Sequence, residues 1–133
     1  MARSERTFPA RPEHVSDARR QVVELARSSG MSEPVLTSVR LAVSEAVANA
    51  VVHGYRDGAA GEVTVVAEAE DSRLKVVVSD AGCGMSPHLG SPGAGLGLPL
   101  IAELADSLSV EPAHAGRGTV LSMTFRLPVA VAA

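Results

Sequence analysis

Aromatic residues are almost absent from this chain of 133 residues, which has no Trp, one Tyr and two Phe. It therefore has no row of aromatic rings on which the bases of a single-stranded nucleic acid could stack. It also lacks an excess of positive charge, because its net charge is −3 at pH 7. An acidic balance argues against a surface for nucleic acid or for an anionic membrane. We therefore expect no direct nucleic-acid partner and no membrane partner.

Cysteine is equally scarce, and the single Cys83 excludes an internal disulfide and fits a reducing cytosol. No apolar run approaches the roughly 20 residues of a membrane span. No apolar stretch follows the first six residues, so the N-terminus does not resemble a signal peptide. The length and the 46% hydrophobic content indicate a single domain over residues 1–133 with one core of Val, Leu and Ala. We expect a soluble, cytoplasmic protein.

Three polar residues interrupt an otherwise apolar helix that ends at Gly54. Glu45, Asn49 and His53 are four residues apart, so they line one edge of the helix. The adjacent face is entirely aliphatic and is expected to pack on a sheet; it consists of Val39, Val43, Ala46, Val47, Ala50 and Val51. Glu and Asn at the margin of such a face must be satisfied by neighbouring side chains or must face a ligand cavity.

Hydrophobic periodicity predicts the remaining elements. We expect strands over 3–10, 62–70, 73–80, 108–112 and 119–127, and helices over 14–29, 32–53 and 96–106. The order β, α, α, β, β, α, β, β lacks the regular alternation of a doubly wound sheet. It predicts an α+β fold: a two-layer α/β sandwich in which a mixed, mainly antiparallel sheet carries the helices on one face.

A loop rich in glycine follows the strand that ends at Asp80, and it begins with Gly82 and Gly84. A carboxylate at the end of an apolar strand, with glycines close behind, could accept a hydrogen bond from an exocyclic amine such as that of adenine. Asp before Gly is also the composition of an ordinary turn. The residue types alone leave both interpretations open.

The same loop ends in Gly93, Gly95, Leu96 and Gly97, at the start of the third helix. Glycines at a helix start offer backbone N–H groups to an anion, although such a loop is often only flexible. The chain contains no G-x-x-x-x-G-K-[ST], so it has no P-loop. The spacing G-x-G-x-G also differs from the dinucleotide-binding fingerprint.

Together, these segments resemble the GHKL (Bergerat-fold) nucleotide-binding superfamily. Within it, they are most similar to the anti-sigma-factor serine/threonine kinases of bacteria. The stretch 42–55 resembles the N-box of that family, 80–84 its first glycine box, and 93–98 its second. Gly118 and Thr119 resemble the Gly-Thr that closes its adenine pocket.

The resemblance implies that ATP and Mg²⁺ bind, with Asn49 as the Mg²⁺ ligand and Glu45 as the general base. It implies that Asp80 and Thr119 contact adenine. It also implies that glycine-box residues approach the base and the phosphates, namely Gly82, Gly84, Gly93, Gly95, Leu96 and Gly97. The implied partners are a sigma factor and an anti-anti-sigma (STAS-type) protein that the kinase phosphorylates. The resemblance also suggests a homodimer formed through the first helix.

One segment departs from the family pattern. The segment 85–92 is shorter than its counterpart in the family and contains no Lys or Arg. Gly93 stands where the family has an Arg. Arg117 is a basic residue near Thr119 that could compensate. Because phosphoryl transfer depends strongly on cations, the sequence also supports an alternative: a nucleotide-gated, partner-binding regulator with little kinase activity. We interpret His53 as a helix-end residue and Cys83 as a small loop residue.

Overall fold

The structure is a computed structural model that describes residues 1–54, 61–81, 97–113 and 118–127. The elements are β1 (Ala2–Pro9), the 3-10 turn η1 (Pro12–His14), α1 (Val15–Ser28), α2 (Glu33–Gly54), β2 (Glu62–Glu70), β3 (Arg73–Asp80), α3 (Gly97–Leu104), β4 (Ser107–Pro112) and β5 (Thr119–Arg126). The predicted order of strands and helices is confirmed. The η1 turn before α1 was not predicted.

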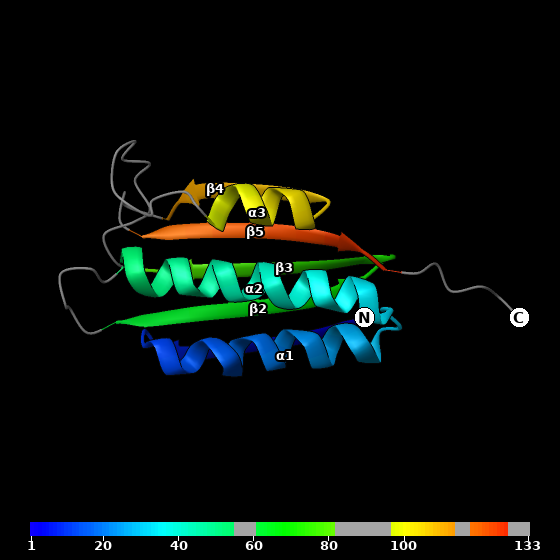
Figure 1. The fold of residues 1–133 in the computed structure, drawn as a ribbon. Helices are drawn as coiled ribbons and strands as arrows, with labels where there is room; N and C mark the ends of the chain where they lie inside the picture. The colour runs from blue at the N-terminus through cyan, green and yellow to red at the C-terminus, as the bar shows by residue number, and fades with distance from the viewer. Residues whose placement is uncertain (55–60, 82–96, 114–117, 128–133) are drawn as a thin grey trace, which may run out of the picture.

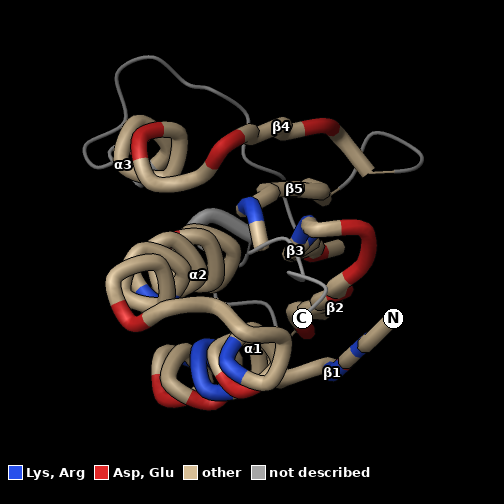
Figure 2. Tube along the Cα trace, turned by 90° about the vertical axis from the view of Figure 1, so that its right-hand side faces the viewer, with Lys and Arg blue, Asp and Glu red and all other residues tan. Residues whose placement is uncertain are grey.

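The five strands form one sheet in the order β1-β2-β3-β5-β4. Every pairing between neighbours is antiparallel, so no parallel pair occurs among the described strands. Figure 1 shows the three helices running roughly parallel to the strands, and Figure 2, turned by 90°, shows all three on the same side of the sheet. The predicted two-layer sandwich is confirmed. The sequence predicted a mixed, mainly antiparallel sheet, and all the pairings between the described strands are antiparallel.

A tight hairpin joins β2 to β3. Asp71 and Ser72 have φ values of 51° and 64°, which lie in the left-handed region. Two successive residues of this kind are the signature of a type I′ turn, whose twist matches that of the flanking strands. The turn fixes the β2–β3 register, in which Glu70 lies opposite Arg73 and Val63 lies opposite Asp80.

The core lies between the sheet and the helices. Alternate residues of β2, β3 and β5 are buried, as expected for strands with one face against a core. Most of the buried side chains are Val, Leu and Ala, and Phe8 and Phe125 are buried with them. The low aromatic content thus gives a core of small aliphatic side chains, which lets the helices lie close to the sheet.

The central helix α2 buries the face that the sequence assigned to the sheet. Val39, Val43 and Ala50 are among its buried residues, and α2 contacts α1, α3 and three strands. The expectation that no apolar run approaches the length of a membrane span was wrong. Glu33–Val52 is long and apolar enough to cross a membrane by length and composition. A helix buried in a core passes the same test, and the packing of α2 on the sheet accounts for its apolar face.

Candidate functional site

Four described element ends meet at one end of the sandwich. In Figure 1 the C-terminal end of α2, the end of β3 and the starts of β5 and α3 all lie on the left. The expected binding residues Asp80 and Thr119 are the last residue of β3 and the first of β5. Glu45 and Asn49 lie in the C-terminal half of α2. The fold therefore brings residues that are far apart in the sequence to the same end of the molecule.

Asp80 and Thr119 form a buried polar pair at this end. They are direct cross-strand partners in the β3–β5 ladder. Asp80 is 6% exposed and Thr119 is 3% exposed, and they alternate with the buried residues that face the helices. A buried carboxylate and a buried hydroxyl require hydrogen-bond partners, so this corner of the core is built for polar contacts.

Gly118 brings the two strands together beside this pair. Its φ is +83°, and a Cβ placed on it would lie 2.1 Å from the backbone oxygen of Asp80. No side chain fits at that distance, so only glycine permits this close approach. Glycine is therefore needed at position 118 for a structural reason. It allows the first residue of β5 to lie against the last residue of β3.

Glu45 and Asn49 are both half-buried on α2. The flank toward α1 is marked by Ser44, whose Oγ accepts a hydrogen bond from Arg19 Nη1 at 3.4 Å. Asn49 comes five residues later, about 140° around the helix, and so lies on the other flank. That flank faces α3, which packs against α2. The predicted polar edge is thus at the α2–α3 side, above the strands that carry Asp80 and Thr119.

The side-chain amide of Asn49 contains a buried polar atom without a hydrogen-bond partner among the described residues. Its Nδ2 is buried and has no hydrogen-bond partner in the part of the chain that is described. A buried polar group without a partner costs about 1–3 kcal/mol, so such groups are rare in a settled core. A 180° turn of the amide exchanges Nδ2 and Oδ1, so the side chain can present either a donor or an acceptor there. This property fits a side chain whose partner is a ligand.

The same amide was expected to bind Mg²⁺, and its donor set fits that ion. Mg²⁺ takes oxygen ligands, few of them from protein, and completes its shell with phosphates and water. Within the described residues there is no group of three or more His, Cys, Asp or Glu side chains that could hold a metal by themselves. The Asn49 oxygen could contribute one ligand to such an ion, beside oxygens of the nucleotide and water.

Several predicted residues lie outside the described part of the chain, namely Gly82, Gly84, Gly93, Gly95 and Leu96, with Cys83, residues 85–92 and Arg117. Gly97 is the first residue of α3, and His53 lies in the last turn of α2. The roles expected for the glycines in binding base and phosphates remain predictions. The α3 start nevertheless lies at the same end as Asp80, where the expected phosphate-binding loop would need it (Figure 1).

Residues 8–125 match the family model of the histidine kinase-like ATPase domain. Among curated proteins, the chain is 32% identical to serine-protein kinase RsbW of Bacillus licheniformis over 131 residues, which covers 87% of this chain and 80% of that protein. It is 34% identical to the anti-sigma F factor of Clostridium acetobutylicum over 127 residues, which covers 87% of each chain.

A solved structure is also similar. It contains the RsbU and RsbW domains of a Mycobacterium tuberculosis protein, and it superposes with a TM-score of 0.72 at 26% sequence identity. The match covers 96% of this chain and 33% of that longer chain. The family match, over residues 8–125, spans the elements that carry Glu45, Asn49, Asp80 and Thr119.

Proposed function

The chain belongs to the histidine kinase-like ATPase domain family, and on this premise we propose that it is an ATP-dependent anti-sigma serine/threonine kinase. Its relatives carry the names serine-protein kinase and anti-sigma F factor. The proposed protein substrate is an anti-anti-sigma protein of the STAS type, and the proposed second partner is a sigma factor. A cytoplasmic location, where both partners would be found, is part of the same proposal.

One observation of the structure carries the proposal. A helix edge with Glu45 and Asn49 and a buried polar pair of Asp80 and Thr119 lie at one end of the sandwich. The helix edge supplies groups suited to reacting phosphates, and the buried pair supplies groups suited to a nucleotide base. A buried carboxylate accepts well from an exocyclic amine, and burial strengthens that hydrogen bond by excluding water. Adenine offers such a donor beside ring acceptors.

The phosphate end would use α2. We assign Asn49 Oδ1 as the Mg²⁺ ligand, because this amide has a buried polar atom without a hydrogen-bond partner and can turn to present its oxygen there. When bound, Mg²⁺ neutralises charge on the transferred phosphoryl group. Glu45, one helical turn before Asn49, then accepts the proton of the attacking serine or threonine hydroxyl. Because phosphoryl transfer needs mainly positioning and charge neutralisation, two side chains on a rigid helix are a suitable scaffold.

The test is transfer of label from γ-labelled ATP to protein. The purified chain is incubated with labelled ATP, Mg²⁺ and a set of STAS-type proteins, in parallel with the Glu45→Ala variant. We expect a serine or threonine of at least one partner to be labelled by the wild type and not by the variant. The absence of Glu45-dependent label on every partner would rule out the kinase proposal.

A second candidate function is favoured by the segment 85–92, which has no Lys or Arg. Without a cation from this segment, phosphoryl transfer can be slower by roughly 10³-fold or more. The chain would then act as a regulator that holds its partner when nucleotide is bound. In that case ATP increases partner affinity in a pull-down or titration, while the rate of label transfer is the same with and without Glu45.

A further inference from the structure

The outward side of α2, away from the sheet, carries exposed apolar side chains. Leu41 is 47% exposed and Val52 is 58% exposed, and Ala48 lies between them, half-buried. These residues are spaced by one and two helical turns, so they line one stripe of the helix over a length of about 16 Å. We call Leu41, Ala48 and Val52 the outer stripe.

The outer stripe has the shape of a shallow saddle. Its two ends are the larger side chains of Leu41 and Val52, and the middle contains the small side chains of Ser44 and Ala48. A second chain can therefore approach the backbone of α2 between the two ends. Single exposed apolar residues are common on protein surfaces, so the shape alone does not indicate a binding surface.

The position of Glu45 distinguishes this stripe from an ordinary surface. Glu45 lies one helical turn after Leu41 and one turn before Ala48, so it borders the stripe on the side of α3. It is half-buried and makes no ion pair within 4.0 Å among the described residues. A general base must come within hydrogen-bond reach of the hydroxyl that it activates. The residues next to that hydroxyl must therefore lie over the outer stripe.

A positive charge borders the stripe on its other side. Arg40 comes four residues before Ser44, so both lie on the flank toward α1. Arg40 is half-buried, and its guanidinium makes no ion pair within 4.0 Å in the described parts of the chain. The saddle thus has a carboxylate on one margin and a guanidinium on the other. A segment with a hydroxyl and a carboxylate complements both charges.

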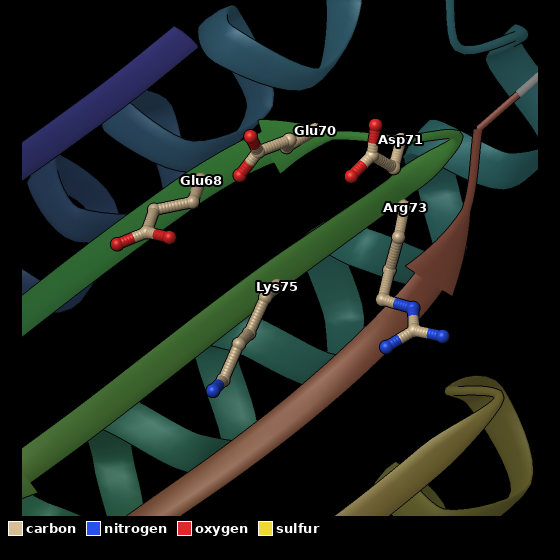
Figure 3. Close-up of a pocket in the computed structure, with 5 residues that line it drawn as sticks. All are labelled: Glu68, Glu70, Asp71, Arg73 and Lys75. Carbon is tan, nitrogen blue, oxygen red and sulfur yellow. The ribbon is translucent and has the colours of Figure 1, made fainter. Parts of the chain in front are cut away.

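A charged hollow between β2 and β3 is a less suitable place for the same partner. Figure 3 shows the five residues that line it, Glu68, Glu70, Asp71, Arg73 and Lys75. Those on the strands alternate with the buried residues that face the helices, so the hollow is on the opposite face of the sheet. A protein bound there would be separated from Glu45 by the sheet itself.

We propose that the outer stripe recognises the protein substrate. Leu41 and Val52 contact aliphatic side chains on either side of the partner's serine or threonine, and Arg40 pairs with a carboxylate of the same segment. The inference rests on the proposed function, because the partner is taken to bring its hydroxyl to Glu45. Leu41, Val52 and Arg40 then determine which protein is bound, and they take no part in the chemical step.

The spacing along α2 defines the segment more closely. Leu41 lies about 6 Å before Glu45 along the helix axis, and Val52 lies about 10 Å after it. An extended segment rises about 3.4 Å per residue. We therefore expect one aliphatic residue two positions from the hydroxyl residue on one side, and another three positions from it on the other side.

The test measures binding of STAS-type proteins in the presence of ATP and Mg²⁺, by titration. We expect Leu41→Asn and Val52→Asn each to raise the dissociation constant by at least about tenfold, because each places an unpaired amide against aliphatic side chains. Val110→Asn, the same change at a valine of β4 that is 38% exposed, should leave the dissociation constant unchanged. Leu41→Ala and Val52→Ala replace the asparagine variants if these fail to fold.

Two substitutions of Arg40 test the charge. Arg40→Glu should weaken partner binding by at least about tenfold, because it places a carboxylate opposite the partner's carboxylate. Arg40→Lys keeps the positive charge and should remain within about threefold of the wild type. For every variant, calorimetry with ATP alone should give the wild-type affinity, which shows that the fold and the nucleotide site are intact.

Binding is measured without turnover, so the results separate this inference from the proposed kinase activity. Partner binding that depends on the outer stripe, without Glu45-dependent label, would support the recognition surface and rule out the kinase. Label transfer together with wild-type affinity in Leu41→Asn and Val52→Asn would overturn the inference alone. An equal loss in Val110→Asn, or a wild-type chain that binds none of the STAS-type proteins, would also overturn it.

Discussion

Asp80 and Thr119 lie directly opposite each other in the β3–β5 ladder, and both are buried although each is the terminal residue of its strand. Strand ends are usually the most exposed part of a sheet. Here Gly118 lets the two strands approach so closely that their polar ends are enclosed. The part of the candidate site that we propose to bind the base is therefore formed by two paired strands, which reduces the ordering that a ligand would have to impose.

The exchange Asp80→Asn tests the base-binding assignment. The amide keeps the shape of the side chain but replaces a charged acceptor, and a hydrogen bond to a charged group is worth about 1.5–3 kcal/mol. We expect the affinity for ATP to fall by about 10- to 100-fold in calorimetric titrations. Glu24→Gln, the same chemical change on the exposed face of α1, is the control. Unchanged ATP affinity in Asp80→Asn would show that the adenine assignment is wrong.

Asn49→Ala separates metal binding from stability. We expect Mg²⁺ to increase ATP affinity in the wild type but not in the variant, because the amide oxygen is the proposed protein ligand. The free energy of unfolding without ligand should change by less than about 1 kcal/mol, because Nδ2 forms no hydrogen bond that could be lost. Titrations with and without a chelator, together with urea unfolding, measure both quantities. A large loss of stability would indicate a structural role instead.

Gly118→Ala tests the close approach of β5 to β3, and Gly30→Ala is its matched control. Both glycines have positive φ, +83° and +93°, but a Cβ on Gly30 would have no atom within 4 Å. We expect Gly30→Ala to cost about 1 kcal/mol of unfolding free energy, from the backbone conformation alone. Gly118→Ala should cost at least about 2 kcal/mol more, because Asp80 must move. Equal losses in urea unfolding would contradict this.

Glu45→Ala distinguishes catalysis from binding. If Glu45 is the general base, label transfer from ATP should fall by about 10²-fold or more. The affinities for ATP and for the partner should change little, because in the complex that we propose Glu45 contacts one hydroxyl group of the partner and no part of the nucleotide. Initial rates of transfer and a partner titration provide the two readouts. A wild-type rate as low as that of the variant would favour the regulator without kinase activity.

The sequence predicted most of the fold because its signals are local. The alternation of β2 and β3 and the Asp71-Ser72 turn define the hairpin, and the aliphatic face of α2 required a sheet. The spacing of Glu45 and Asn49 placed them on one edge, and the structure places that edge beside α3. The glycine boxes and their contacts remain predictions, because residues 82–96 lie outside the described structure.

Other features could not be predicted because they depend on which elements meet. Gln21 reads as an ordinary polar residue of an amphipathic helix, yet it is 8% exposed and donates to Ser4 Oγ at 2.8 Å and to the Val65 oxygen at 3.2 Å. Arg19 is a charged residue of the same amphipathic helix, yet it is half-buried and donates a hydrogen bond to Ser44 on α2. Both contacts require the register between α1 and its neighbours, which no local pattern specifies.

The direction of the strands also has a practical consequence. The first residue of β1 and the last residue of β5 lie at the end of the sheet opposite Asp80, as Figure 1 shows. Eight residues of strand separate these points from the candidate site, a distance of about 27 Å. A dye, an affinity tag or a surface anchor attached next to either strand end would leave the approach to Asp80 unobstructed. Immobilised protein should therefore bind nucleotide as the protein in solution does.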